Sequence, residues 1–296
     1  MKATVLKRAG VLIALFLLFS SNAWSAENLK PYMQVVSDTT DFNAAVASTK
    51  NKLQSAGFDV VGEYSPYENA QVIVVSNDEL KASAAKSKFG GYGAVVRVSV
   101  TQNGDKIEVT YSNPVYWARA YRLGDDQADV AAKLTAALGD AKAFGSEKGL
   151  TVKKLGKYHY MAFMPYFDDP DKLGGFASYA DALAKINSNL EAGKNGIKKV
   201  YEVDIPGKEE SLIGIAMTEG AAADKNIMDK IDIEGTRHTA HLPYEILVSG
   251  DEAYALSAKF RIALSFPDLS MMGKGSFVEI MDAPPAIKEQ LSSLTK

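Results

Sequence analysis

Two histidines lie close together in the stretch RHTAH, in the second half of the chain. His238 and His241 are two of only three histidines in 296 residues. Imidazole nitrogen is a good ligand for zinc, copper and nickel, and Asp229, Asp232 and Glu234 lie close enough in sequence to supply further donors. The alternative is a polar surface loop leading into a strand, where alternation would turn the two rings to opposite faces. We keep His238 and His241 as a candidate metal pair.

Methionine supplies a second kind of ligand. The chain has nine methionines and no cysteine. Thioether sulfur favours Cu(I), whereas methionine in a protein core fills irregular gaps. Both interpretations stay open for the methionines of the second half, which are Met161, Met164, Met217, Met228, Met271, Met272 and Met281.

An aromatic and cationic cluster follows Pro114. Tyr116 and Trp117 stand beside Arg119 and Arg122 in one short stretch. Aromatic rings with guanidinium groups can line a pocket for an anionic ligand. The alternative is a helical turn that faces the core and leaves its arginines in solvent. These four residues are our candidate ligand-binding set.

Recognisable catalytic signatures are absent from the sequence. There is no G-x-S-x-G elbow, phosphate-binding loop, H-E-x-x-H or dinucleotide fingerprint. The acidic run FDDPD at 167–171 lacks the spacing of a calcium loop and is typical of an acidic turn. We therefore expect no cofactor and no catalytic residues.

Composition bounds the class of protein. Apolar residues make up 47% of the chain and charged residues 23%, which is normal for a globular protein. A net charge of −3 argues against a nucleic-acid partner. Without cysteine, the chain has neither disulfides nor thiol chemistry.

The first 25 residues have the features of a secretory signal peptide. Lys2, Lys7 and Arg8 precede the apolar run VLIALFLLF at 11–19, and small residues follow before Ala26. The run is too short for a membrane span, which takes about 20 residues. We expect a periplasmic or secreted protein with no membrane span after signal removal.

The remaining chain repeats itself. TYSNPVYWAR (110–119) is matched by ALSFPDLSMM (263–272), and Lys106, Ser112 and Pro114 are matched at the same spacing by Lys259, Ser265 and Pro267. Apolar alternation before each proline predicts a strand in both copies. Upstream, two segments with apolar residues at helical spacing follow Asp41 and Ser178, each of which is a candidate N-cap.

These matches predict an α+β fold made of two tandem similar domains, each a mainly antiparallel sheet with helices packed on it. The domains are expected at 30–143 and 158–296, joined by a polar linker at 144–157. Asn103-Gly104 predicts a hairpin in the first copy. In the second copy we expect a first strand at 158–164 and a hairpin over 243–265.

The chain resembles the domain-of-unknown-function family 302. The resemblance rests on VIVVSNDEL (72–80), on Asn113-Pro114 at a strand end, and on LPYEILV (242–248). It implies a compact α+β fold that often self-associates, and it implies no catalytic residues.

We therefore expect an exported, non-enzymatic binding or accessory protein, whose partner is a small anionic ligand or another envelope protein. The first alternative is a periplasmic metal-handling protein that uses His238, His241 and methionines, and the second is an unrecognised hydrolase or redox accessory enzyme. We expect Met271 and Met272 to pack between the domains, and the turn of Trp117 and Arg119 to border an open pocket.

Overall fold

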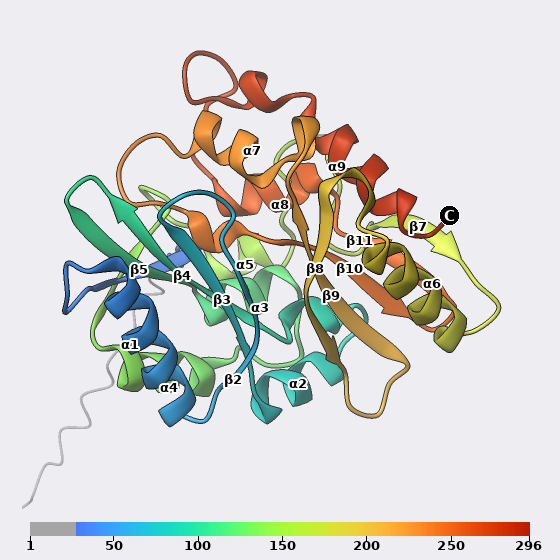
Figure 1. The fold of residues 1–296 in the computed structure, drawn as a ribbon, viewed down its shortest axis with the longest axis horizontal. Helices are drawn as coiled ribbons and strands as arrows, with labels where there is room; N and C mark the ends of the chain where they lie inside the picture. Colours follow the sequence, from blue (N-terminus) through green and yellow to red (C-terminus); the bar gives the residue numbers. More distant parts are fainter. Residues whose placement is uncertain (1–27) are drawn as a thin grey trace, which may run out of the picture.

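The structure is a computed structural model that describes residues 28–296 (Figure 1). The predicted signal peptide, 1–25, lies outside the described residues. Two antiparallel sheets with helices packed on them form the α+β fold expected from the sequence. No helix in the described range is long and apolar enough to cross a membrane.

Each sheet is built from one half of the chain. The first has the order β2-β3-β4-β5-β1-β6 and the second has the order β7-β11-β10-β9-β8. The strands are β1 (Tyr32–Val36), β2 (Asp59–Tyr64), β3 (Ala70–Ser76), β4 (Val96–Asn103), β5 (Lys106–Ser112), β6 (Ala141–Phe144), β7 (Asp171–Gly175), β8 (Ile197–Asp204), β9 (Glu210–Met217), β10 (Tyr244–Ser249) and β11 (Glu252–Ala255).

The helices cover the sheets and connect the strands. The α-helices are α1 (Phe42–Ser55), α2 (Asp78–Ala85), α3 (Pro114–Ala120), α4 (Ala128–Leu138), α5 (Val152–Leu155), α6 (Tyr179–Glu191), α7 (Asp224–Ile231), α8 (Ala258–Ser265) and α9 (Ala283–Ser293). The short 3-10 helices are η1 (Gly90–Gly93), η2 (Lys194–Gly196), η3 (Gly220–Ala222), η4 (Thr239–His241) and η5 (Phe277–Ile280).

The two halves repeat one topology. Apart from β6, the order β2-β3-β4-β5-β1 of the first sheet corresponds to β8-β9-β10-β11-β7 of the second. Even an irregularity is repeated, because the ladder shifts register between Val60 and Gly62 in β2 and between Lys199 and Tyr201 in β8. The predicted tandem repeat is therefore confirmed at the level of topology.

The two sheets face each other across a central core, to which α3 and α8 also contribute, and other helices lie on the outside. Figure 1 shows α1 and α4 on one side of the molecule and α6 and α9 on the other. Along β3, Ile73 and Val75 pack in the outer core, whereas Val72 and Val74 pack in the core between the sheets. Because successive strand residues point to opposite faces, each sheet contributes side chains to two cores, one on each face.

The contact between the repeats follows an approximate two-fold relation. The turn η1 contacts β9 and β10 of the second sheet, and its counterpart η4 contacts β3, β4 and β5 of the first. The equivalent edge strands β2 and β8 also contact each other. Each repeat thus presents the same surface to the other, as the subunits of a two-fold dimer do.

The local signals at the helix starts and at the first hairpin are confirmed. Asp41 accepts a hydrogen bond from Ala44 N (2.7 Å), and the Ser178 hydroxyl accepts one from Asp181 N (3.1 Å), so both residues cap their helices. The chain turns at Gly104, which adopts φ +61° between β4 and β5. A positive φ favours glycine there.

The alignment of 106–114 with 259–267 is wrong. The first segment contains β5, but the second contains the helix α8, and the counterpart of β5 is β11. Every residue of α8 except Lys259 is buried, so its apolar residues cover all faces and their spacing does not distinguish helix from strand. The strand expected at 158–164 is also absent, since β7 begins only at Asp171.

Candidate functional site

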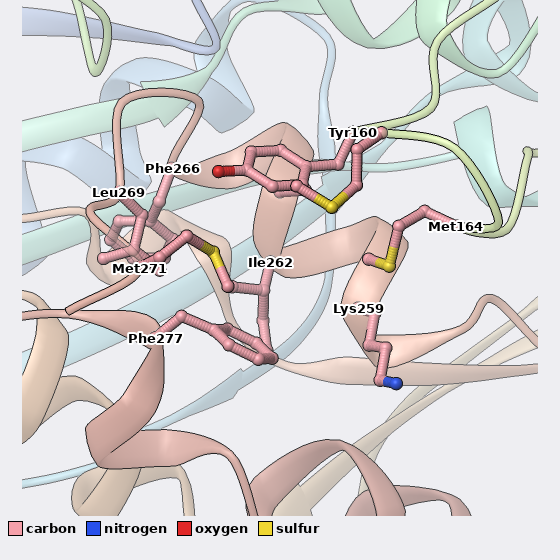
Figure 2. Close-up of a pocket in the computed structure, with 10 residues that line it drawn as sticks. Tyr160, Met164, Lys259, Ile262, Phe266, Leu269, Met271 and Phe277 are labelled. Carbon is pink, nitrogen blue, oxygen red and sulfur yellow. The ribbon is translucent and has the colours of Figure 1, made fainter.

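An apolar groove opens beside α8, where two loops face each other (Figure 2). Met164 from one loop lies opposite Met271 from the other, with Ile262 between them. Met161 and Phe266 also line the groove. Its volume is about 90 Å³, which is well below the roughly 300–1,000 Å³ of a drug-sized ligand site. The groove is lined by Tyr160, Met161, Met164, Lys259, Ile262, Ala263, Phe266, Leu269, Met271 and Phe277.

The rim of the groove is unusually apolar for an exposed surface. Met161 and Met271, which line it, are 50% and 45% exposed. Phe163 and Met272, which are neighbours of lining residues in the sequence, are fully exposed and 79% exposed. Lys259, drawn in Figure 2 at the rim, is the charged residue among those lining the groove. Large exposed apolar side chains gathered around a hollow mark an interaction site more often than scattered single ones do.

The expected roles of the methionine turn and the tryptophan turn are reversed. Met271 and Met272 are exposed, so they do not pack between the domains. Trp117 is only 4% exposed and Tyr116 is fully buried in the core between the sheets. Their polar atoms are bonded inside, because the Tyr116 hydroxyl donates to Leu264 O (2.8 Å) and Trp117 Nε1 donates to Pro31 O (2.9 Å).

The two arginines of the aromatic set point elsewhere. Arg119 forms an ion pair with Asp126 (2.9 Å), and Arg122 forms one with Asp168 (2.7 Å). Both arginine side chains are about one-third exposed. The structure therefore does not bring Tyr116, Trp117, Arg119 and Arg122 together around one open pocket, because the aromatic residues of α3 point inward whereas Arg119 and Arg122 pair with carboxylates at the surface.

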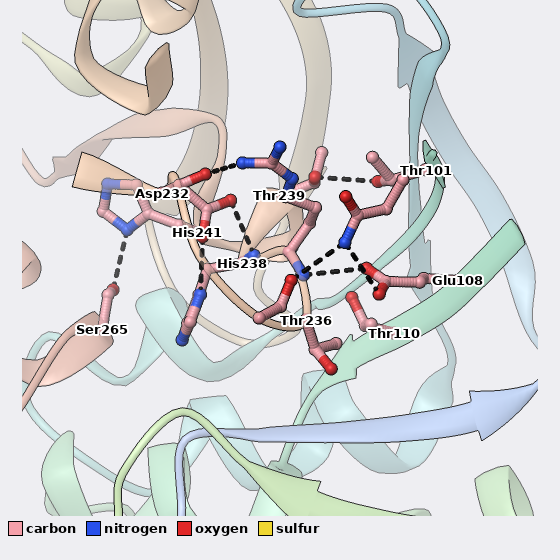
Figure 3. Close-up of polar contacts among 12 residues, drawn as sticks. Thr101, Glu108, Thr110, Asp232, Thr236, His238, Thr239, His241 and Ser265 are labelled. Atoms are coloured by element: carbon pink, nitrogen blue, oxygen red, sulfur yellow. Dashed lines mark hydrogen bonds and ion pairs between the residues drawn. The ribbon is translucent and has the colours of Figure 1, made fainter. Parts of the chain in front are cut away.

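The two candidate metal ligands also have separate partners (Figure 3). His238 Nδ1 lies 2.7 Å from Asp232 Oδ1, whereas both ring nitrogens of His241 are engaged, by Ser265 Oγ (2.7 Å) and by the Tyr244 hydroxyl (3.0 Å). Burial holds the pKa of His241 well below its ordinary value, so this ring is neutral. Within residues 28–296, no three His, Cys, Asp or Glu side chains are grouped to hold a metal ion.

The loop before η4 ties the second repeat to the first sheet (Figure 3). The backbone N–H of Arg237 donates to Glu108 (2.8 Å), and the Thr101 hydroxyl donates to Thr239 (2.8 Å). Asn103 donates to the Gly235 carbonyl oxygen (2.9 Å). The stretch that contains the two histidines thus serves as a structural bridge between the repeats.

A polar cleft of about 610 Å³ lies beside this bridge. His238 borders it together with lysines and carboxylates from both repeats. Charges of both signs are mixed along its walls, in Lys30, Lys142, Lys274, Glu147, Glu234 and Asp268.

A buried ionic cluster joins the repeats at their centre. Glu245 pairs with Arg97 (2.8 Å) and with Arg261, and the Tyr201 hydroxyl donates to the same carboxylate (2.7 Å). All three charged side chains are at most 2% exposed. Burial raises the pKa of Glu245, but Arg261 and Arg97 outweigh burial and hold that pKa below its ordinary value.

Arg97 and Glu245 hold equivalent positions in the two repeats. Each is the second residue of its strand, and Arg97 pairs with Val74 of β3 as Glu245 pairs with Gly214 of β9. Equivalent residues face each other where they lie close to the axis of a two-fold contact, and here they carry opposite charges. A lone charge in each of the apolar runs AVVRVSV and PYEILV is the sequence signal that could have revealed this pair.

Asp224, at the start of α7, is another buried group that the sequence did not reveal. It accepts hydrogen bonds from the Tyr64 hydroxyl of the first repeat (3.0 Å) and from Met217 N (3.3 Å). Its second oxygen, Oδ1, has no partner within the described residues. Burial raises the pKa of Asp224 to about 7, although the two hydrogen bonds act in the opposite direction.

Comparison with known proteins gives a distant structural likeness. No family model and no curated protein matches the sequence. Among solved structures, the chain is similar to an uncharacterised conserved protein, DUF302, from Bacillus stearothermophilus. The two share 18% identity with a TM-score of 0.33, over 36% of this chain and 94% of that one.

Proposed function

We propose that the protein is an exported, non-enzymatic binding or accessory protein of the cell envelope, and that its partner is another polypeptide. The observation that carries this proposal is the apolar groove beside α8, with exposed methionines around it. Export is supported by the n-region, apolar run and small residues of 1–25.

The size of the groove favours a side chain over a whole small molecule. A volume of about 90 Å³ accepts one aliphatic side chain, and drug-sized ligands need several times more. A partner segment with one apolar anchor fits this hollow. Lys259 at the rim then pairs with an acidic residue next to that anchor.

Methionine suits such a contact. Its side chain is unbranched and flexible, so it adapts to partner side chains of differing shape. Here Met161 and Met271 line the groove from opposite loops and are about half exposed. The mixed charges of the polar cleft beside His238 give no comparable preference for one chemical class.

Selection from a random peptide library displayed on phage tests the proposal. We expect enriched peptides to share an apolar anchor beside an acidic residue, and to lose at least tenfold in affinity for Met271→Glu. Met281→Glu is the matched control, because Met281 is 57% exposed but does not line the groove. No enrichment, or peptides that bind both variants equally well, would refute the proposal.

Metal handling by methionines is the second candidate. The structure separates His238 from His241, but it places Met161, Met164 and Met271 around one hollow. Thioether groups favour Cu(I). Replacing the three methionines with leucine keeps the apolar volume but removes the sulfur, so it abolishes Cu(I) binding in a competition titration and leaves peptide docking nearly intact.

We also propose that each repeat is a domain of family 302. The equal strand order of the two sheets and the register shift shared by β2 and β8 support a duplication. The stretches that resemble the family lie in both repeats, with VIVVSNDEL (72–80) in the first and LPYEILV (242–248) in the second. An experimental structure of this protein, with each repeat superposed separately on a member of the family, tests this assignment.

A further inference from the structure

The ionic cluster that joins the repeats contains two positive charges and one negative charge. Arg97 and Arg261 share the single carboxylate of Glu245, and all three side chains are at most 2% exposed. The neighbouring imidazole of His241 is neutral. Glu210, another buried carboxylate, forms no ion pair with either arginine within the described residues and accepts instead from Gly91 N (2.9 Å) and Ser249 Oγ (3.2 Å). Taking an uncompensated charge out of water costs several kcal/mol.

Buried groups that could donate a hydrogen bond, but do not, lie around the same ionic cluster. The hydroxyls of Tyr32, Tyr92 and Tyr121 are buried and donate no hydrogen bond within the described residues, although Ser265 lies close to the Tyr32 hydroxyl and Arg97 close to that of Tyr121. Nε of Arg261 has no partner within the same residues. Native proteins leave few buried polar atoms unpaired, and each such atom calls for an explanation such as a bound water or ion.

These groups gather around one ring. The guanidinium carbons of Arg97 and Arg261 lie 5.2 and 5.9 Å from the Trp117 ring centroid. The rings of Tyr32 and Tyr121 lie 6.3 and 5.4 Å from the same ring. The surplus charge and the unused donors therefore belong to one region, formed by residues of both repeats.

We propose that one small anion of halide size binds in this region, held by the hydroxyls of Tyr32 and Tyr121 and by Nε–H of Arg261. Tyrosine hydroxyls rotate to donate, and hydrogen bonds to an ion are stronger than those between neutral groups. A monovalent anion balances the single surplus charge. The enclosing side chains are nearly fully buried, which favours a monoatomic ion over a phosphate or an organic acid.

Crystals of the whole protein grown in sodium bromide locate the ion directly. We expect one anomalous peak within hydrogen-bond distance of the Tyr121 hydroxyl and Arg261 Nε. Water density at that position, or bromide peaks at surface residues alone, would overturn the proposal. The diffraction test needs no variant, so it does not depend on how a substitution affects folding.

Solution stability gives a second test. At constant ionic strength, exchange of methanesulfonate for chloride or bromide should raise the urea midpoint and then saturate, as binding to one site does. Tyr121→Phe should abolish this rise. Tyr116→Phe is the matched control, because its equally buried hydroxyl already donates to Leu264 O, and it should retain the full halide response. Equal halide responses in the two variants would refute the site.

Discussion

The carboxyl group of Asp224 should make the stability of the protein depend on pH in a defined window. Burial raises its pKa from 3.8 to about 7 in the folded protein. Between these values the folded state keeps a proton that the unfolded chain releases. The contribution of Asp224 to the free energy of unfolding is therefore most favourable below about pH 4, and it falls as the pH rises to about 7.

The size of this change in unfolding free energy follows from the pKa shift of Asp224. A change from 3.8 to about 7 corresponds to up to about 4 kcal/mol lost above pH 7, at about 1.4 kcal/mol for each pH unit. Asp224→Asn keeps the shape and the oxygen that accepts from Tyr64, but it carries no charge at any pH. The variant should match the wild type near pH 4 and exceed its stability at pH 8.

Urea unfolding followed by tryptophan fluorescence measures this difference. Trp24 and Trp117 are the two tryptophans of the sequence, so protein lacking 1–25 reports through Trp117 alone, which is buried between the repeats. We expect the difference between variant and wild type to grow from pH 4 to pH 7 and then to level off. A difference that is constant across this range would refute the buried, protonated state of Asp224.

Three further predictions concern the contact between the repeats. Glu245→Gln removes the carboxylate that pairs with both Arg97 and Arg261 and should cost about 3–5 kcal/mol in urea unfolding; a loss below about 1 kcal/mol would contradict a stabilising role for this buried pair. Gly62→Ala places a Cβ 2.2 Å from Val200 O, so β2 and β8 must separate and the thermal midpoint should fall; an unchanged midpoint would contradict this packing. Trp117→Ala should lower the unfolding free energy by about 3–5 kcal/mol, because Trp117 is buried between the repeats. Met272→Ala, at a side chain 79% exposed, should change it by less than about 0.5 kcal/mol. Equal losses would contradict a buried Trp117 and an exposed Met272.

The parts of the fold that the sequence predicts correctly are those fixed by short-range chemistry. Asp41 and Ser178 cap helices through contacts three residues away, and Asn103-Gly104 makes a tight turn. A buried helix is harder to assign. In α8 both Phe260 and Ala263 are buried, so the burial pattern gives no period to read.

The candidate sites depended on contacts that sequence spacing does not encode. Tyr116 and Trp117 lie in the core because a second sheet covers them, and the stretch around them does not reveal that sheet. Arg97 finds its carboxylate 148 positions away, in the other repeat. The duplication itself was the available clue, since equivalent positions near the axis of a two-fold contact lie opposite each other.

The proposal that a polypeptide docks in the methionine groove is tested most directly by NMR of the methionine methyl groups, with a library-selected peptide added. We expect the methyl resonances of Met161, Met164 and Met271 to shift and to saturate together, because these residues line the groove. The resonances of Met217 and Met228, buried in the core of the second repeat, should stay in place. Binding that leaves the groove methionines unshifted would contradict the proposed function.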